Sequence, residues 1–146
     1  MALKQKFPNQ VIGNTGLFYV CYELSKRGWN VLPTSRNAKG PDIIIYNTDA
    51  TITHTIQVKA ISGKVDTVNL GEKDKISNLT ADYFIICSNV DENPNCYIMT
   101  KDEIISCTIE YKNRKTGKIN MWVQPTKRRG VKHGFREFKD NWDKIK

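Results

Sequence analysis

The chain has 146 residues, of which 39% are hydrophobic and 26% are charged, a balance that predicts one globular domain over residues 1–146. No run approaches the ~20 apolar residues of a membrane span, and residues 1–6 lack the apolar core of a signal peptide, so we expect a cytoplasmic protein that does not use a membrane. The four widely spaced cysteines favour reduced thiols over zinc ligands or disulfides.

The positive charge is unevenly distributed. The net charge is +8, and residues 112–146 hold 12 Lys and Arg against three acidic residues, whereas residues 1–111 hold 11 against 12. An excess of this kind favours a polyanionic partner, and nucleic acid is the usual one. A solvated basic tail that aids solubility is the simpler alternative.

The first elements follow from apolar spacing and turn residues. Apolar residues at helical intervals predict a helix over residues 10–27, with Asn14 as a candidate N-cap and Gly28 as its C-terminal stop. A short strand over residues 29–34 follows. A polar loop then leads to Asp42.

Two β-rich runs, residues 41–46 and 53–60, are joined by Asn-Thr-Asp-Ala, which predicts a hairpin. Gln57 and Lys59 are two residues apart, so they project from the same face of their strand. Asp42 begins the first run. Pairing of the two strands would bring a carboxylate, an amide and an ammonium group together.

Later segments are predicted from the same signals. Residues 72–78 are expected to form one or two helical turns, and residues 81–88 and 96–99 to form strands. A capping box at residues 100–103 opens a short helix. Residues 108–123 predict a second hairpin, with Trp122 favoured as core. Phe135, Phe138, Trp142 and Ile145 fall at helical spacing and predict a closing amphipathic helix.

The groups on the first hairpin suit metal-assisted hydrolysis of a phosphodiester bond. Asp42 would hold a hard divalent cation, with the Gln57 side-chain oxygen and the Val58 backbone carbonyl as neutral ligands. Lys59 would orient an attacking water or offset charge that builds on a phosphate.

Pro41-Asp42 followed by Gln57-Val58-Lys59 resembles the PD-(D/E)xK nuclease superfamily, in the variant where Gln takes the second acidic place. Residues 13–29 are similar to the first helix of small resolvase-like and homing-endonuclease-like members. The resemblance covers roughly residues 10–90. It implies an α/β, restriction-endonuclease-like fold with an αβββαβ core and a central mixed sheet of four or five strands flanked by helices, here with a basic C-terminal hairpin and helix.

The resemblance also implies a Mg²⁺-dependent DNA endonuclease, in which Mn²⁺ would substitute, with Asp42, Gln57 and Lys59 as catalytic residues. Relatives often place a glutamate early on the first helix, where it reaches the metal. The matching position here is Leu17, which cannot bind metal. Glu23, six residues later, is a further metal candidate, with exposure or ion pairing as the alternative.

Basic residues near the site and in the last quarter of the chain are candidate phosphate contacts. They are Arg36, Lys39, Lys64, Arg114, Lys115, Lys127, Arg128, Arg129 and Lys132. The expected partner is DNA, with RNA left open, and double-strand cutting with one site per chain would favour a homodimer. Two alternatives remain open: a catalytically inactive nucleic-acid-binding module with the nuclease fold, and a subunit or toxin–immunity-type partner protein.

Overall fold

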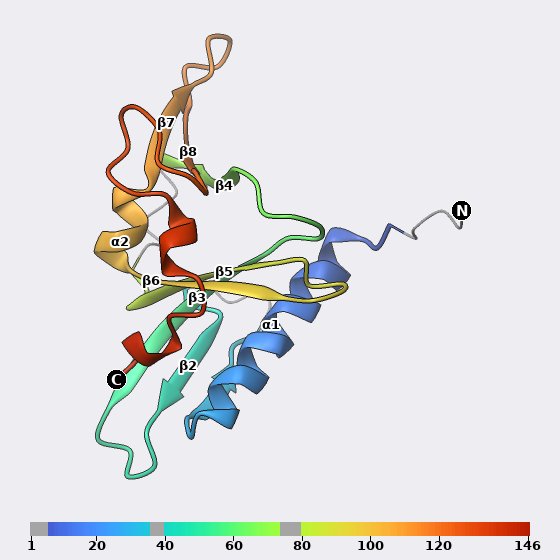
Figure 1. Cartoon of the computed structure of the whole chain (residues 1–146), viewed down its shortest axis with the longest axis vertical. Helices are drawn as coiled ribbons and strands as arrows, with labels where there is room; N and C mark the ends of the chain where they lie inside the picture. Colours follow the sequence, from blue (N-terminus) through green and yellow to red (C-terminus); the bar gives the residue numbers. More distant parts are fainter. Residues whose placement is uncertain (1–5, 36–39, 74–79) are drawn as a thin grey trace.

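The computed structural model describes residues 6–35, 40–73 and 80–146. Figure 1 shows its elements in the order α1 (Asn9–Lys26), β1 (Asn30–Pro33), β2 (Ile43–Tyr46), β3 (Thr53–Ala60), β4 (Val68–Glu72), β5 (Tyr83–Ser88), β6 (Asn95–Thr100), α2 (Lys101–Ser106), β7 (Thr108–Lys112) and β8 (Ile119–Val123). Two 3₁₀ helices, Phe135–Phe138 and Trp142–Lys144, follow. In the part of the chain described, no helix is both long and apolar enough to cross a membrane.

The main sheet has five strands in the order β1-β2-β3-β5-β6. Its neighbours pair antiparallel except β3 and β5, which are parallel, so the sheet is mixed, as the sequence predicted. The β2–β3 hairpin is confirmed, with Ile43 opposite Ile56 and Tyr46 opposite Thr53. The fold is therefore of the mixed α/β class.

Both faces of the main sheet are covered. Side chains alternate along β5, so Ile85 enters the core under α1 while Ile86 enters a second core on the opposite face. Ile104 of α2 belongs to the second core. The capping box at the start of α2 is confirmed by Thr100, whose hydroxyl accepts from the Glu103 N–H while its own N–H donates to the Glu103 carboxylate.

A second sheet, absent from the predictions, has three strands in the order β4-β8-β7 and stands apart from the main sheet in Figure 1. The β7–β8 hairpin was predicted, but its partner β4 was not. Glu72, expected to begin a helix, lies in β4, and residues 74–79 lie outside the described residues. The β3-to-β5 crossover, expected to be a helix, thus contains a strand.

The predicted closing helix is wrong. Phe135 packs in the core beside α2, whereas Trp142 and Ile145 pack in the core under α1, on the opposite face of the main sheet. One straight helix cannot contact both faces. The chain instead passes along β6, where the Asp140 N–H donates to the Cys96 carbonyl at 2.8 Å, and Asp140 has a φ of 55°. The expected burial is confirmed for the aromatic residues Phe135 and Trp142 and for Ile145.

Two smaller expectations are also corrected. Asn14 is no N-cap, because α1 begins at Asn9 and Asn14 lies inside the helix. Trp122 is half-buried and belongs to neither core, because it faces away from the buried side of β8, where Val123 packs. The cysteines are free thiols: Cys87, Cys96 and Cys107 are buried and Cys21 is half-buried.

Candidate functional site

The backbone of Asp42 is held from both neighbouring strands. Gly40, two residues earlier, has a φ of 119°, which L side chains rarely adopt. The Thr34 N–H donates to the Asp42 carbonyl at 2.8 Å, and the Thr34 hydroxyl donates to the Pro41 carbonyl at 2.7 Å. From β3, the Ile56 carbonyl accepts from the Asp42 N–H at 3.0 Å. These contacts fix the point from which the carboxylate projects.

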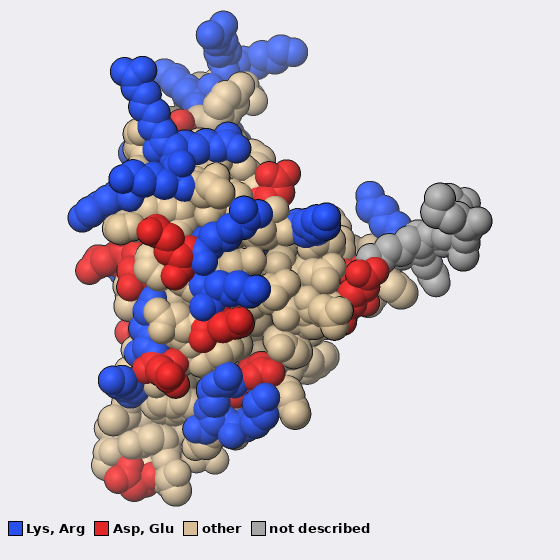
Figure 2. All heavy atoms as spheres, viewed as in Figure 1, with Lys and Arg blue, Asp and Glu red and all other residues tan. Residues whose placement is uncertain are grey.

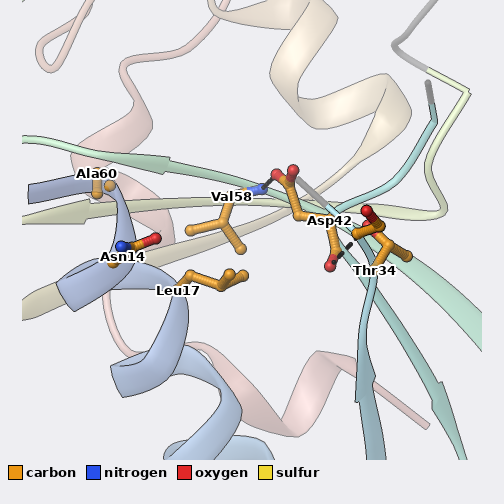
Figure 3. A pocket seen from close by; sticks show the side chains of 8 residues that line it. Asn14, Leu17, Thr34, Asp42, Val58 and Ala60 are labelled. Carbon is orange, nitrogen blue, oxygen red and sulfur yellow. Dashed lines mark hydrogen bonds between the residues drawn. The ribbon is translucent and has the colours of Figure 1, made fainter. Parts of the chain in front are cut away.

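The Asp42 side chain reaches across to β3. Its Oδ2 accepts one hydrogen bond from the Gln57 Nε2 and one from the Val58 N–H, each at 2.8 Å. Figure 3 shows the bond between Asp42 and Val58 as a dashed line. The structure thus brings Asp42 and Gln57 together, and their catalytic roles stay predictions.

The orientation of the Gln57 amide follows from its partner. An ionised carboxylate only accepts hydrogen bonds, so it is Nε2 and not Oε1 of the amide that contacts Asp42. Oε1 is buried and has no hydrogen-bond partner among the residues that the structure describes. A buried acceptor without a donor costs about 1–3 kcal/mol. Oε1 is therefore the atom of this group that is suited to an electropositive ligand.

Burial raises the pKa of Asp42 above its ordinary value. The Val58 N–H and the charge of Lys59 lower this pKa, but by less than burial raises it. Lys59 lies two residues beyond Gln57 on the same side of β3, and its side chain is exposed. The negative charge of Asp42 is only partly compensated, so a bound cation would stabilise it.

A cavity of ≈ 180 Å³ lies beside Asp42, between α1 and the β1–β2 end of the sheet. Leu17 and Asn14 line it from α1, and Val58 lines it from β3 (Figure 3). Leu17 thus occupies the position beside the carboxylate where the resemblance implied an acidic residue in relatives. A neighbouring hollow of ≈ 480 Å³ includes Lys59 among its lining residues.

Glu23 lies elsewhere on α1 and does not line this cavity. It is buried and forms ion pairs with Arg27 and Lys26. Burial raises its pKa, but hydrogen bonds from these cations outweigh burial and hold the pKa below its ordinary value. The ion-paired alternative therefore describes Glu23. Across the described ranges, no three His, Cys, Asp or Glu side chains form a group that could hold a metal.

The candidate phosphate contacts form two sets, one near Asp42 and one in the last quarter of the chain. In the set near Asp42, Arg36 and Lys39 lie outside the described residues, and Lys64 is exposed in the loop after β3. The exposed members of the last quarter are Arg114, Lys115, Lys127, Arg128, Arg129 and Lys132. They lie on the β7–β8 turn and on the loop of residues 125–134, in the half of the molecule where Lys and Arg gather in Figure 2.

Sequence reasoning missed the part that Thr34 plays in holding Asp42. The sequence signal for this contact was weak, because threonine is common at the end of a short strand and Asp42 lies eight residues further along the chain. Gly40 gave a clearer signal, since a glycine directly before Pro-Asp marks a sharp change of backbone direction.

No protein-family model matches this sequence, and no curated protein matches it. Among solved structures, the chain is similar to "The structure of a bacterial homing endonuclease: I-Ssp6803I", with a TM-score of 0.61. The two chains are 19% identical, and the match covers 96% of this chain and 92% of that chain. At this identity the likeness establishes the fold: this chain has a mixed α/β architecture similar to that of a homing endonuclease.

Proposed function

We propose that this protein is a metal-dependent endonuclease that hydrolyses DNA phosphodiester bonds, with Asp42, Gln57 and Lys59 as its catalytic residues. The observation that carries the proposal is the 2.8 Å hydrogen bond that joins Asp42 to Gln57 across the β2–β3 pair, with Lys59 two residues further along β3. The likeness of nearly the whole chain to a bacterial homing endonuclease supports the same class of reaction.

The donor set fits a hard divalent cation, Mg²⁺ or Mn²⁺. Such ions prefer oxygen ligands, and Asp42 supplies an anionic oxygen, while the buried Gln57 Oε1, which has no hydrogen-bond partner in the described part of the chain, supplies a neutral one. The Val58 N–H points at Asp42, and the carbonyl of an extended residue faces the same side as its N–H, so this carbonyl is a third candidate ligand. When bound, the ion would supply Lewis-acid activation of a phosphate and a water of lowered pKa.

The remaining groups would bind and orient the substrate. Lys59 is exposed, and its positive charge would offset the negative charge that builds on the phosphate during attack. Thr34 would keep the Asp42 carboxylate in place through the backbone. The exposed cations of residues 112–132 would grip the phosphate backbone away from the reacting bond, which makes binding salt-dependent.

A second candidate function is a nucleic-acid-binding module that keeps the fold without the chemistry. The specific observation in its favour is Leu17, an apolar side chain in the cavity beside Asp42. With one carboxylate at the site, cation affinity in the absence of DNA would be low. This alternative predicts DNA binding that survives substitution of Asp42 and is never followed by cleavage.

The test is cleavage of supercoiled plasmid and of branched DNA with Mg²⁺ and with Mn²⁺, by the parent protein and by Asp42→Asn and Lys59→Ala variants. We expect the parent to cut and each variant to lose at least about a hundredfold in rate, the scale of removing one electrostatic catalyst. Glu23→Gln is the matched control and keeps the parent rate. Cleavage that persists in both site variants would refute the proposal, and binding without cleavage by the parent would select the second candidate.

A further inference from the structure

Two of the four cysteines lie in contact. Cys87 of β5 and Cys96 of β6 stand directly opposite each other in an antiparallel pair, and their Sγ atoms are 3.2 Å apart. Both side chains enter the core under α1, where they are 0% and 1% exposed. Cys107 packs in the core on the opposite face of the main sheet, and Cys21 is half-buried on α1. The fold therefore brings one pair of thiols together and keeps it apart from Cys107.

The backbone at this pair has the geometry that a disulfide needs. Directly opposed residues of antiparallel strands have Cα atoms about 4.5–5.5 Å apart, and disulfides join Cα atoms about 4.4–6.8 Å apart. From 3.2 Å, the two Sγ atoms need to approach each other by only about 1 Å to form the bond. A small rotation of the two side chains supplies this movement, so β5 and β6 can stay paired.

The surroundings keep this pair of thiols protonated while it is buried. The hydrogen bond with Cys87, burial, and the negative charges of Asp140 and Glu23 raise the pKa of Cys96 above its ordinary value. The thiolate is the reactive form in thiol–disulfide exchange. The buried pair is therefore unreactive, and its oxidation requires that solvent reach it.

Residues 139–146 cover this part of the core, and we refer to them as the C-terminal cover. Figure 1 shows the segment, drawn in red, beside β6, to which one isolated β-bridge joins it. The Asp140 N–H donates to the Cys96 carbonyl at 2.8 Å. Trp142 and Ile145 pack in the same core as the two cysteines. Release of this segment from β6 would bring solvent to the pair.

Lys144 attaches the C-terminal cover to the rest of the fold. Its Nζ donates to the Ile98 carbonyl of β6 at 2.9 Å and forms an ion pair with Glu103 of α2. The Lys144 side chain is only 14% exposed. Removal of one partner from a buried ion pair leaves the other charge uncompensated. Loss of the Lys144 ammonium group would therefore favour release of the cover without removing any β5–β6 hydrogen bond.

We propose that Cys87 and Cys96 are a redox modification site that closes to an internal disulfide on reaction with a small disulfide oxidant such as oxidised glutathione, and that the C-terminal cover controls access to it. The thiolate of one cysteine attacks a sulfur of the oxidant, which releases one glutathione thiolate and leaves a mixed disulfide. The second cysteine attacks the protein sulfur of this mixed disulfide and releases the second glutathione. The protein loses two electrons and two protons, and oxidised glutathione becomes two reduced molecules.

The first experiment is incubation of the folded, fully reduced chain with oxidised glutathione, without denaturant, DNA or metal. Remaining thiols are blocked, and mass spectrometry of a protease digest identifies the linked cysteines. We expect the parent to gain a disulfide-linked peptide that joins Cys87 to Cys96, and Cys96→Ala to form no internal disulfide. A parent that forms no internal disulfide, or that joins Cys21 or Cys107 instead, would overturn the proposal.

The second experiment tests the C-terminal cover. Lys144→Ala should form the disulfide at least about tenfold faster than the parent, because local opening sets access to buried groups. Lys101→Ala is the matched control, since it removes an equal charge from an exposed lysine of α2 and should leave the rate unchanged. Equal rates in the two variants would overturn the role of the cover.

Cys107 distinguishes local opening from global unfolding, because it is buried on the opposite face of the main sheet. In Lys144→Ala it should stay protected from a thiol-alkylating reagent while Cys87 and Cys96 become accessible. Alkylation of Cys107 at the same rate as the pair would show global unfolding and would contradict a local cover. None of these measurements involves DNA cleavage, so this proposal and the proposed nuclease activity fail separately.

Discussion

At the scale of single residues, Asp42 combines a constrained backbone with a charge that the fold disfavours. Thr34 and Ile56 hold its main chain, and Gln57 and Val58 hold its carboxylate. Burial still raises its pKa. Its folded pKa lies above the unfolded value, so Asp42 destabilises the fold at pH values above the folded pKa; this cost declines as the pH falls through the folded pKa and is gone below the unfolded pKa.

Asp42→Asn is therefore expected to abolish cleavage while leaving stability at neutral pH equal to that of the parent or higher by up to about 1 kcal/mol. Asparagine removes the buried charge and keeps an oxygen that accepts from the Val58 N–H. Urea unfolding of both proteins without divalent metal measures the difference. A variant clearly less stable than the parent would show that the carboxylate supports the fold.

The same pKa direction sets the pH dependence of cation binding. A divalent cation needs the ionised carboxylate, so Mn²⁺ affinity is full above the raised pKa of Asp42 and falls as the pH drops through it. The loss begins at a higher pH than for an ordinary aspartate, whose pKa is about 3.9. Mn²⁺ titration across pH measures this. Affinity that stays constant down to the ordinary value would contradict the assignment.

Sequence pattern was sufficient to pair Asp42 with Gln57, because both lie on one hairpin and strand alternation fixes which side chains share a face. It was not sufficient for Thr34, whose contact with Asp42 depends on how the β1 edge strand ends. It also left Glu23 open, since a helical wheel gives a direction but no partner. Its ion pairs with Arg27 and Lys26 required the folded helix.

At the scale of elements, α1 is positioned by one small residue. A Cβ on Gly16 would lie 2.4 Å from the Cβ of Ala60 on β3, so the glycine permits a close approach of helix and sheet. Gly13, one turn earlier, has nothing within 4 Å of an added Cβ. The two glycines therefore differ in function, although both lie in the first half of the helix.

We expect Gly16→Ala to destabilise the protein by about 1–3 kcal/mol, because the added methyl overpacks the contact with Ala60. Gly13→Ala is the matched control and should stabilise it by up to about 1 kcal/mol through helix propensity. Thermal or urea unfolding of both variants measures the difference. Equal effects of the two substitutions would contradict the close approach of α1 to β3.

Elements with strong local signals were predicted correctly: α1, the β2–β3 hairpin, the buried strand β5 and the capped helix α2. The elements that were predicted wrongly are those whose structure depends on long-range contacts. The sequence around β4 shows a thin apolar pattern, and β4 is a strand because β8, about fifty residues later, pairs with it. The C-terminal aromatics keep helical spacing, yet they pack on two faces of one sheet, which only the assembled fold reveals.

At the scale of the whole molecule, the exposed cations of the last quarter of the chain and the site at Asp42 occupy different regions. The exposed cations of residues 112–132 lie on and beside the second sheet, whereas the site at Asp42 lies between α1 and β2 (Figures 1 and 2). This separation would let the basic region hold phosphates away from the reacting bond.

Replacing Lys127, Arg128 and Arg129 together by alanine is expected to weaken binding to all DNA sequences alike. The plot of log affinity against log salt has a negative slope, and each lost phosphate contact makes this slope less steep by about 0.9. In the triple variant the magnitude of the slope should therefore decrease by roughly 2–3. Lys26→Ala, at the last residue of α1, is the control and should leave the slope unchanged. Fluorescence anisotropy at several salt concentrations measures it. An unchanged slope in the triple variant would exclude the 125–134 loop from the DNA contact.

The most direct test of the proposed site is anomalous diffraction from a crystal of the protein with DNA and Mn²⁺. We predict a Mn²⁺ peak about 2.0–2.3 Å from a carboxylate oxygen of Asp42 and within ligand distance of the Gln57 Oε1. A crystal that binds DNA and shows no peak beside Asp42, or shows one bound elsewhere while Asp42 keeps its hydrogen bonds to Gln57 and Val58, would contradict the account.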